Sequence, residues 1–329
     1  MIDTRLGLAC RESGLNLRGP GRVLAVMPSQ DAVLAELPQD ETDIVQDVKP
    51  VFAAWEARGF QTLTQPQGPY SAAVVSLPRA KKLAQSMIYD ALACTEGPVI
   101  VDGQKTDGVE SILRQVRKRQ KIDGQIAKAH GKLFWFEAEA GLFEDWACGP
   151  ERTAGGFWTA PGVFSADGID PASALLATHL PDALGKRVAD LGAGWGFLSA
   201  HVLTRPIVET VHLVEASHIA LECAKRNVTD PRAAFHWADA TTWKSADAVD
   251  TVVMNPPFHQ TRAATPELGQ SFIEAAARML TTRGQVWMVA NRHLPYEATL
   301  AAHFADVREI GDDPRFKIFH ASRPKRAKL

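Results

Sequence analysis

Apolar and polar positions along the second half of the chain follow the pattern of strands alternating with helices. Five short apolar runs predict buried strands at 186–191, 210–215, 234–239, 250–255 and 284–291. Stretches with helical spacing lie between or after them, at 197–204, 217–228 (with Ser217 as its N-cap), 267–280 and 295–304. Segments 307–310 and 316–322 predict a closing hairpin. Such alternation is typical of an α/β fold with a mostly parallel sheet.

The first half also predicts α/β structure, from fewer and weaker signals. Strands are expected at 23–27, 74–77 and 98–101, and helices at 51–58, 80–92 and 109–120. No glycine-rich ligand loop follows any of these strands, because the turn at 101–103 lacks the repeated glycines that such a loop needs. Proline and glycine concentrate at 145–163, and a length of 329 residues suggests two domains. We therefore expect domains at 1–149 and 150–329.

Composition excludes several classes of protein. Hydrophobic residues make up 46% and charged residues 22%, which is ordinary for a soluble globular chain. The net charge of −2 does not by itself indicate a nucleic-acid partner. The 4 cysteines are widely spaced without a C-x-x-C pair, so we expect neither a metal site nor a disulfide framework. No signal-peptide pattern and no apolar run of about 18 residues is present, so a cytoplasmic protein without membrane segments is expected.

A glycine turn, Asp190-Leu191-Gly192-Ala193-Gly194-Trp195-Gly196, follows the first strand of the second half. It has the form D-x-G-x-G-x-G rather than the G-x-G-x-x-G of dinucleotide-binding folds. Gly192 and Gly194 would let backbone N–H groups approach a ligand, and Gly196 would let the next helix begin close to the strand. The preceding acid would repel a pyrophosphate but suits a cation, such as the amino-acid end of S-adenosylmethionine. Taken alone, such a turn is also found where no ligand binds.

Polar residues at the ends of the following strands strengthen this interpretation. Glu215 ends the second strand and is expected to hold ribose hydroxyls, while Asp239 and the adjacent Ala240 are expected beside the adenine. Asn255 ends the fourth strand. Because the carboxyl ends of parallel strands form the ligand crevice of such sheets, these residues should lie at one edge.

The segment Asn255-Pro256-Pro257-Phe258 indicates methylation of an amino group on a planar, electron-withdrawing system. The lone pair of such an amine is delocalised, which makes the nitrogen a poor nucleophile. The Asn255 side-chain oxygen and the Pro256 carbonyl can accept both N–H bonds and favour a pyramidal nitrogen. Phe258 can stack on the flat substrate. No strong base is required, because the methyl donor carries a positive sulfonium.

Five segments together resemble the bacterial ribosomal RNA guanine-N2 methyltransferases: TAPGVFSADGIDPAS at 159–173, DLGAGWG, VVMNPPFH, VANRHLPY and RFKIFHASR. The resemblance implies two Rossmann-like α/β domains, the second a class I methyltransferase fold and the first a degenerate copy that helps to recognise RNA. It implies that Asn255, Pro256 and Phe258 act on the target base. It also places Phe164 and Asp170 near the methionine end of S-adenosylmethionine. Pro171-Ala172 and the bulky Trp195 depart from the family pattern, which could change cofactor affinity.

Two basic surfaces are candidates for RNA contact. Arg114, Arg117 and Lys118 share one face of a predicted helix, although a merely solvated face has the same pattern. Arg315, Lys317 and Arg323 belong to a basic C-terminal segment that we expect near the substrate mouth, although such a tail can serve only solubility. Pro257 and His259, which flank Phe258, are further candidates for contact with the base.

The leading hypothesis is a monomeric, S-adenosylmethionine-dependent methyltransferase that acts on small-subunit (16S) ribosomal RNA, free or within a ribosomal particle. The sister activity on large-subunit (23S) RNA remains an alternative. Glutamine methylation of a release factor also uses N-P-P, but typically with tyrosine in place of Phe258. Adenine-N6 methylation has no supporting recognition segment. A non-catalytic assembly factor would have no reason to keep both motifs intact.

Overall fold

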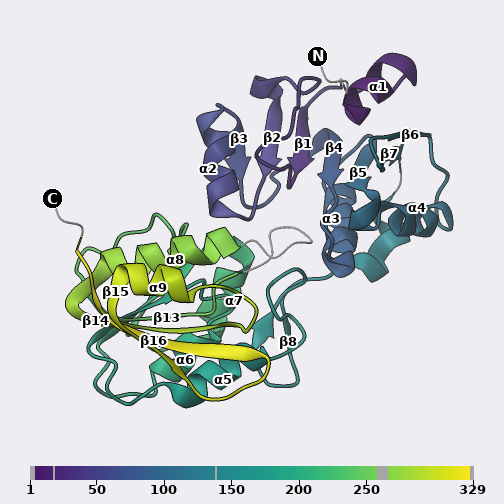
Figure 1. The fold of residues 1–329 in the computed structure, drawn as a ribbon. Helices are drawn as coiled ribbons and strands as arrows, with labels where there is room; N and C mark the ends of the chain where they lie inside the picture. The colour runs from purple at the N-terminus through teal and green to yellow at the C-terminus, as the bar shows by residue number, and fades with distance from the viewer. Residues whose placement is uncertain (1–3, 18, 138, 258–265, 327–329) are drawn as a thin grey trace. The chain divides into compact units, whose positions relative to one another are not determined.

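The structure is a computed structural model that describes residues 4–17, 19–137, 139–257 and 266–326. The chain divides into two compact units, Met1–Pro150 and Glu151–Leu329 (Figure 1). The division falls one residue after the boundary expected at Gly149. We call these unit 1 and unit 2 and describe each by itself.

Unit 2 is built on a seven-stranded sheet with the order β12-β11-β10-β13-β14-β16-β15. Neighbours from β12 to β14 are parallel, and β16 is antiparallel to both β14 and β15. The chain leaves β10 toward β11 and β12 on one side and returns to β13 on the other. The order therefore reverses between β10 and β13, and at such a point the carboxyl ends of the strands open a ligand crevice. The strands are β10 (Arg187–Leu191), β11 (Thr210–Glu215), β12 (Ala233–Trp237), β13 (Val249–Met254), β14 (Leu280–Asn291), β15 (Phe304–Ile310) and β16 (Phe316–Pro324).

Helices cover both faces of this sheet because its strands alternate two apolar faces. Figure 1 shows α8 and α9 near one side of this sheet and α5 and α6 near the other. Ala189 and Val252 pack in a core with residues of α8 and α9, whereas Val188 and Val253 pack with residues of α5, α6 and α7. The predicted N-cap of α7 is confirmed, since the Ser217 hydroxyl accepts a hydrogen bond from the backbone N–H of Ala220 at 3.2 Å. The helices are α5 (Pro171–His179), α6 (Phe197–Val202), α7 (His218–Asn227), α8 (Pro266–Met279) and α9 (Glu297–His303). A small antiparallel pair, β8 (Glu151–Arg152) and β9 (Trp158–Thr159), precedes them.

Unit 1 repeats the topology of unit 2. Its seven-stranded sheet has the order β3-β2-β1-β4-β5-β7-β6, in which each strand occupies the place of its counterpart in unit 2. The first five are parallel neighbours, and β7 is antiparallel to β5 and β6. The expectation of two similar α/β halves is confirmed. The strands are β1 (Arg22–Val26), β2 (Thr42–Val45), β3 (Gln61–Leu63), β4 (Tyr70–Ser76), β5 (Val99–Gln104), β6 (Gly124–Lys128) and β7 (Gly131–Phe136), and the helices are α1 (Arg5–Glu12), α2 (Lys49–Ala57), α3 (Lys81–Ala93) and α4 (Val109–Arg117).

Two side chains of unit 1 bond to the turn after β1, at the edge that corresponds to the glycine turn of unit 2. The turn after β1 contains Pro28 and no glycine. Gln46 directly follows β2, the counterpart of β11, and so corresponds to Glu215 in unit 2. It is buried and donates from Nε2 to the Pro28 carbonyl at 3.1 Å. Trp55 donates from Nε1 to the same carbonyl at 3.2 Å. The Pro28 carbonyl is therefore bonded within unit 1, at a turn that has no glycine to bring backbone N–H groups close to a ligand.

Candidate active site

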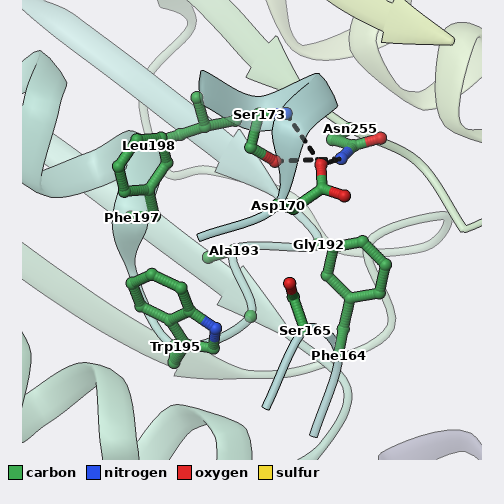
Figure 2. Close-up of a pocket in the computed structure, with 11 residues that line it drawn as sticks. Phe164, Ser165, Asp170, Ser173, Gly192, Ala193, Trp195, Phe197, Leu198 and Asn255 are labelled. Carbon is green, nitrogen blue, oxygen red and sulfur yellow. Dashed lines mark hydrogen bonds between the residues drawn. The ribbon is translucent and has the colours of Figure 1, made fainter. Parts of the chain in front are cut away.

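A cavity lies at the carboxyl ends of β10 and β13 in unit 2, where the strand order reverses (Figure 2). Three segments that are distant in the sequence form its wall: the loop before α5 with the first turn of that helix, the glycine turn with the start of α6, and the residue after β13. Its lining residues are Phe164, Ser165, Asp170, Ser173, Gly192, Ala193, Gly194, Trp195, Phe197, Leu198 and Asn255.

The glycine turn adopts a backbone conformation that side chains disfavour. Gly192, Gly194 and Gly196 have φ values of 72°, 55° and 92°. A Cβ on Gly194 would meet no atom within 4 Å, so this glycine faces open space on the cavity side. A Cβ on Gly196 would lie 2.9 Å from Cγ2 of Val228, beside the end of α7. Gly194 thus leaves room for a ligand, and Gly196 allows α6 to start against α7.

Glu215 is bonded to the same turn. Its Oε2 accepts the backbone N–H of Gly194 at 2.7 Å, and its Oε1 accepts the backbone N–H of Ser217 at 2.8 Å. The carboxylate is therefore fixed between the glycine turn and the start of α7. Glu215 is not among the described residues that line the cavity, and its expected ribose-binding role remains a prediction.

Asp190 does not line the cavity, contrary to what its place before the first glycine suggests. Only 1% of the residue is exposed, and Oδ2 accepts a hydrogen bond from the Ser199 hydroxyl of α6 at 2.7 Å. Strand alternation is the cause, because Ala189 and Leu191 face the opposite core. Oδ1 is buried without a partner among the described residues. Burial, with the nearby charge of Glu215, raises the pKa of Asp190 to about 7, although the Ser199 bond acts to lower it.

Asp239 and Ala240 lie further along the crevice and are not among the described residues that line the cavity. Asp239 Oδ1 accepts both the backbone N–H and the hydroxyl of Thr241, at 2.8 and 2.7 Å. Ala240 is 4% exposed and belongs to the core beneath α8. Contact between the Ala240 side chain and a cofactor is therefore not supported, while the adenine-binding role of Asp239 remains a prediction.

Asn255 is the residue through which the N-P-P-F segment reaches the cavity. Its Nδ2 donates to Asp170 Oδ2 and to Ser173 Oγ, each at 2.9 Å (Figure 2). Pro256 is buried and Pro257 is exposed, so the first proline anchors the segment after β13. Phe258 and His259 lie outside the described residues.

The loop before α5 supplies an exposed aromatic ring and a helix cap. Phe164 lines the cavity although 56% of it is exposed, and Ser165 beside it has a φ of 54°. Asp170 caps α5 by accepting the backbone N–H of Ser173 at 2.7 Å. The sequence placed both Phe164 and Asp170 near a cofactor. Both line the cavity, and the side chain of Asp170 accepts a hydrogen bond from Asn255.

One residue that supports the site was missed in the sequence. Asn227, the last residue of α7, donates from Nδ2 to the carbonyls of Trp158 and Trp195, each at 2.8 Å. Its Oδ1 accepts the backbone N–H of Trp158 at 2.7 Å. Trp195 in turn packs against Phe157 and Phe197, with ring centroids 4.8 and 5.8 Å apart. Asparagine at a helix end is so common that no sequence signal distinguishes this role.

The basic residues have different outcomes. Arg114, Arg117 and Lys118 are exposed on or beside α4, as expected, and Arg117 donates to Gln125 of β6. Lys317 is paired with Glu297 and its side chain is only 12% exposed, so it is not available as an RNA contact.

Arg323 lies at the wrong end of the sheet for the role predicted from sequence. Register pairs Asn291 with Phe316 at the carboxyl edge and Gln285 with Ser322 toward the opposite edge. The expectation that Arg323 adjoins the substrate mouth is therefore wrong, whereas Arg315 precedes Phe316 at the cavity edge and is exposed.

Two further features bear on the class of protein. Among the residues that the structure describes, no cluster of His, Cys, Asp and Glu could hold a metal ion. Within the same ranges, no helix has both the length and the apolar character needed to cross a membrane.

The strand order of unit 2, its glycine turn and the Asn-Pro-Pro segment after β13 define a class I methyltransferase fold. The sequence profile described as the methyltransferase small domain matches residues 154–320, and the chain belongs to this family.

One curated relative and one solved structure match nearly the whole chain, and a second curated relative matches about half of it. Ribosomal RNA small subunit methyltransferase C of Hahella chejuensis is 28% identical over 324 residues, covering 92% of this chain and 94% of the relative. Ribosomal RNA large subunit methyltransferase G of Ectopseudomonas mendocina is 35% identical over 167 residues, 49% of this chain and 44% of that protein. A T. thermophilus 16S rRNA N2 methyltransferase, solved with AdoMet and guanosine, has a TM-score of 0.76 at 22% identity, covering 94% of this chain and 90% of that one. This last likeness supports the two-domain fold.

Proposed function

We propose that this chain transfers a methyl group from S-adenosylmethionine to the exocyclic N2 amino group of a guanine in small-subunit ribosomal RNA. The observation that carries the proposal is the position of Asn255, whose amide nitrogen is held by Asp170 and Ser173 at the cavity beside the glycine turn. The relative named for activity on the small ribosomal subunit matches nearly the whole chain, including the unit that lacks the glycine turn.

The residues around the cavity fit S-adenosylmethionine. This cofactor supplies a methyl group on a positively charged sulfonium, together with an ammonium group. Gly194 leaves open space at the turn, and Glu215 is fixed beside it to accept hydroxyl hydrogens. Oδ1 of Asp190 is buried without a partner among the described residues. Because burial raises the pKa of this carboxyl to about 7, a cation bound nearby would favour its ionised form.

The target amine would be polarised by oxygen atoms that follow β13. With both hydrogens of its Nδ2 bonded within the protein, Asn255 has its Oδ1 available to accept an N–H of the guanine. The Pro256 carbonyl is the second acceptor in this proposal. As the nitrogen takes the methyl group, its bond to carbon forms while the sulfur–carbon bond breaks, and positive charge passes to the nitrogen. The extra proton then leaves to water, so no strong base is needed. Alignment of the guanine nitrogen, the methyl carbon and the sulfur supplies much of the rate acceleration.

Guanine must leave its stack to reach this cavity. Phe258 is the proposed stacking partner, and the exposed ring of Phe164 provides a second aromatic surface at the cavity. Arg315 at the cavity edge and the exposed cations of α4 are proposed to contact RNA phosphates. Ribosomal RNA or a ribosomal particle in the cytoplasm would be the partner.

One observation favours a second candidate. The relative named for activity on the large subunit is more similar in sequence over its matched segment, at 35% identity, than the small-subunit relative is over nearly the full chain. That match spans only about half of this chain. Methylation of guanine N2 in large-subunit RNA is therefore the alternative substrate choice for the same chemistry.

The test is transfer of labelled methyl groups from S-adenosylmethionine to 30S particles, 50S particles, naked ribosomal RNA and a release factor, followed by digestion of the product. N2-methylguanosine from 30S particles or their RNA is the expected product. The same nucleoside from 50S particles alone would select the alternative. Label only in the release factor would overturn the RNA assignment. An Asn255→Ala variant serves as the control for contaminating activity, since it should retain cofactor binding but lose transfer.

A further inference from the structure

Asp170 holds the catalytic amide across 85 residues of sequence. Asn255 Nδ2 donates to Asp170 Oδ2 and to Ser173 Oγ, each at 2.9 Å (Figure 2). The same Oδ2 accepts the backbone N–H of Ser173 at 2.7 Å. Because this second bond is the N-cap of α5, the carboxylate has a fixed position, and so does the amide bonded to it.

This contact determines which end of the Asn255 amide faces the cavity. An ionised carboxylate only accepts hydrogen bonds, so the amide must turn its NH₂ group toward Asp170 and its oxygen away. The Ser173 hydroxyl can either donate or accept, so it would tolerate both orientations. Asp170 is therefore the partner that excludes the reversed amide, in which NH₂ would face the substrate and could accept nothing.

The charge of Asp170 also affects the strength of the site. Hydrogen bonds to an ionised group are roughly twice as strong as neutral ones. A negative charge is favoured at the N-terminus of α5 by the helix dipole. A carboxylate that pulls on the NH₂ group polarises the amide and increases the negative charge on its Oδ1. This oxygen is the atom that meets the amine as positive charge develops there, so the polarisation favours the transition state.

We propose that Asp170 is a positioning residue for methyl transfer: it orients and polarises the Asn255 amide, in addition to capping α5. The inference rests on the proposed function, because it assigns Asp170 a part in the same reaction. It replaces the expectation that Asp170 binds the methionine end of the cofactor.

Two substitutions at Asp170 separate the cap from the contact with Asn255. Serine is a good N-cap but is too short to keep the bond to Asn255. Asparagine keeps both the cap and the contact with Asn255. Its side-chain carbonyl oxygen takes the place of Oδ2, because the backbone N–H of Ser173 needs an acceptor there. Only the negative charge is lost. A residue that merely caps α5 would tolerate both changes equally. A positioning residue tolerates asparagine much better than serine.

The experiment measures single-turnover methyl transfer to 30S particles at saturating S-adenosylmethionine, with thermal unfolding and cofactor binding measured in parallel. We expect Asp170→Ser to reduce the rate constant roughly 100-fold and Asp170→Asn by about tenfold or less, in line with loss of one oriented hydrogen bond. Melting temperature and cofactor affinity should remain close to wild type in both variants. In an Asn255→Ala background, Asp170→Ser should cause no further loss, because its effect passes through Asn255.

The proposal is overturned if Asp170→Ser transfers methyl groups at the wild-type rate. It is also overturned if Asp170→Ser reduces the rate constant by the same factor in the wild-type and Asn255→Ala backgrounds. A loss of stability or of cofactor affinity as large as the loss of rate would overturn it too.

A second readout does not depend on activity. The side-chain NH₂ resonances of Asn255, identified by their disappearance in Asn255→Ala, should be protected from solvent exchange in wild type and Asp170→Asn but not in Asp170→Ser. Equal protection in all three refutes the contact. If wild type methylates no ribosomal acceptor while this protection pattern holds, the proposed function fails and the orienting role of Asp170 stands.

Discussion

The backbone N–H of Gly194 and Oε2 of Glu215 are joined by a hydrogen bond of 2.7 Å that ties the glycine turn to the end of the neighbouring strand. Oε1 of the same carboxylate accepts the backbone N–H of Ser217. The carboxylate is therefore fixed by two donors before any ligand arrives. A ligand hydroxyl meets an acceptor whose position needs no rearrangement, which reduces the entropic cost of binding.

Glu215→Gln should weaken cofactor binding at least tenfold. The substitution replaces a charged acceptor with an amide that must point its NH₂ group toward one of the two backbone N–H donors. A hydrogen bond to a charged group contributes about 1.5–3 kcal/mol, and about 1.4 kcal/mol is a tenfold change in affinity. Calorimetric titration with S-adenosylmethionine measures the effect. Glu209→Gln is the matched control, since Glu209 is exposed on the same unit and its side chain pairs with Lys186 on the surface. Unchanged affinity in Glu215→Gln would remove Glu215 from the cofactor site.

Asp190 should make the ligand-free protein less stable as the pH rises from about 4 to about 7. The pKa of this carboxyl is raised from 3.8 to about 7 by burial, so in this window the folded state holds a proton that the unfolded state has lost. Each pH unit then costs the folded state up to roughly 1.4 kcal/mol. Asp190→Asn keeps an acceptor for Ser199 but cannot titrate, so it should flatten the profile and be more stable than wild type at pH 8.

Urea unfolding of wild type and variant at pH 5 and pH 8 checks this prediction. Asp247→Asn, at an exposed position, should shift neither value. Parallel pH profiles for wild type and Asp190→Asn would mean that Asp190 ionises normally in the folded protein.

Gly196→Ala should be more destabilising than Gly156→Ala. Both glycines have positive φ, 92° and 83°, so both substitutions incur about 1–2 kcal/mol of backbone strain. Only at Gly196 would the new Cβ approach a side chain, at 2.9 Å from Val228, which adds about 1–3 kcal/mol of overpacking. Free energies of unfolding measured in denaturant provide the comparison. Equal losses would show that the contact between α6 and α7 relaxes at no cost.

Arg315→Gln should weaken RNA binding severalfold and reduce the salt dependence of binding by about one phosphate contact. Arg323→Gln should change neither quantity. The two arginines are matched, with side chains 67% and 64% exposed and an aspartate beside each, but they lie toward opposite edges of the sheet. Binding of ribosomal RNA measured at several salt concentrations distinguishes them. A stronger effect of Arg323 would place the RNA surface away from the cavity edge.

The strands of unit 2 could be predicted because burial on both faces produces continuous apolar runs. The expected strand at 210–215 coincides with β11, Thr210–Glu215. β14 begins four residues before its expected start, because its first residues include the polar Thr281 to Arg283, of which Thr282 and Arg283 are exposed. In unit 1, β2, β3 and β6 were missed because they mix polar residues with too few apolar ones. The apolar strand β7 was missed although its burial is nearly complete.

The site was predictable in its location but not in its contacts. Strand ends indicated that Glu215 and Asn255 would meet at one edge, because parallel topology brings such ends together. The partners of these side chains depend on distant segments, such as Asp170 for Asn255 and Glu297 for Lys317, and no local pattern encodes them. Asp190 was assigned to the ligand although strand alternation directs its side chain under α6.

The identical strand order of the two units has a consequence for the history of the chain. Two sheets that follow one another in the sequence with the same order and the same pairing directions are the expected product of a tandem duplication of one ancestral domain. In the second copy, a glycine turn and Glu215 remain at the crevice; in the first, Pro28 and Gln46 occupy the equivalent places and bond to each other. A first copy without the glycine turn does not carry the constraints that such a turn imposes, which fits the part in RNA contact proposed for its exposed cations.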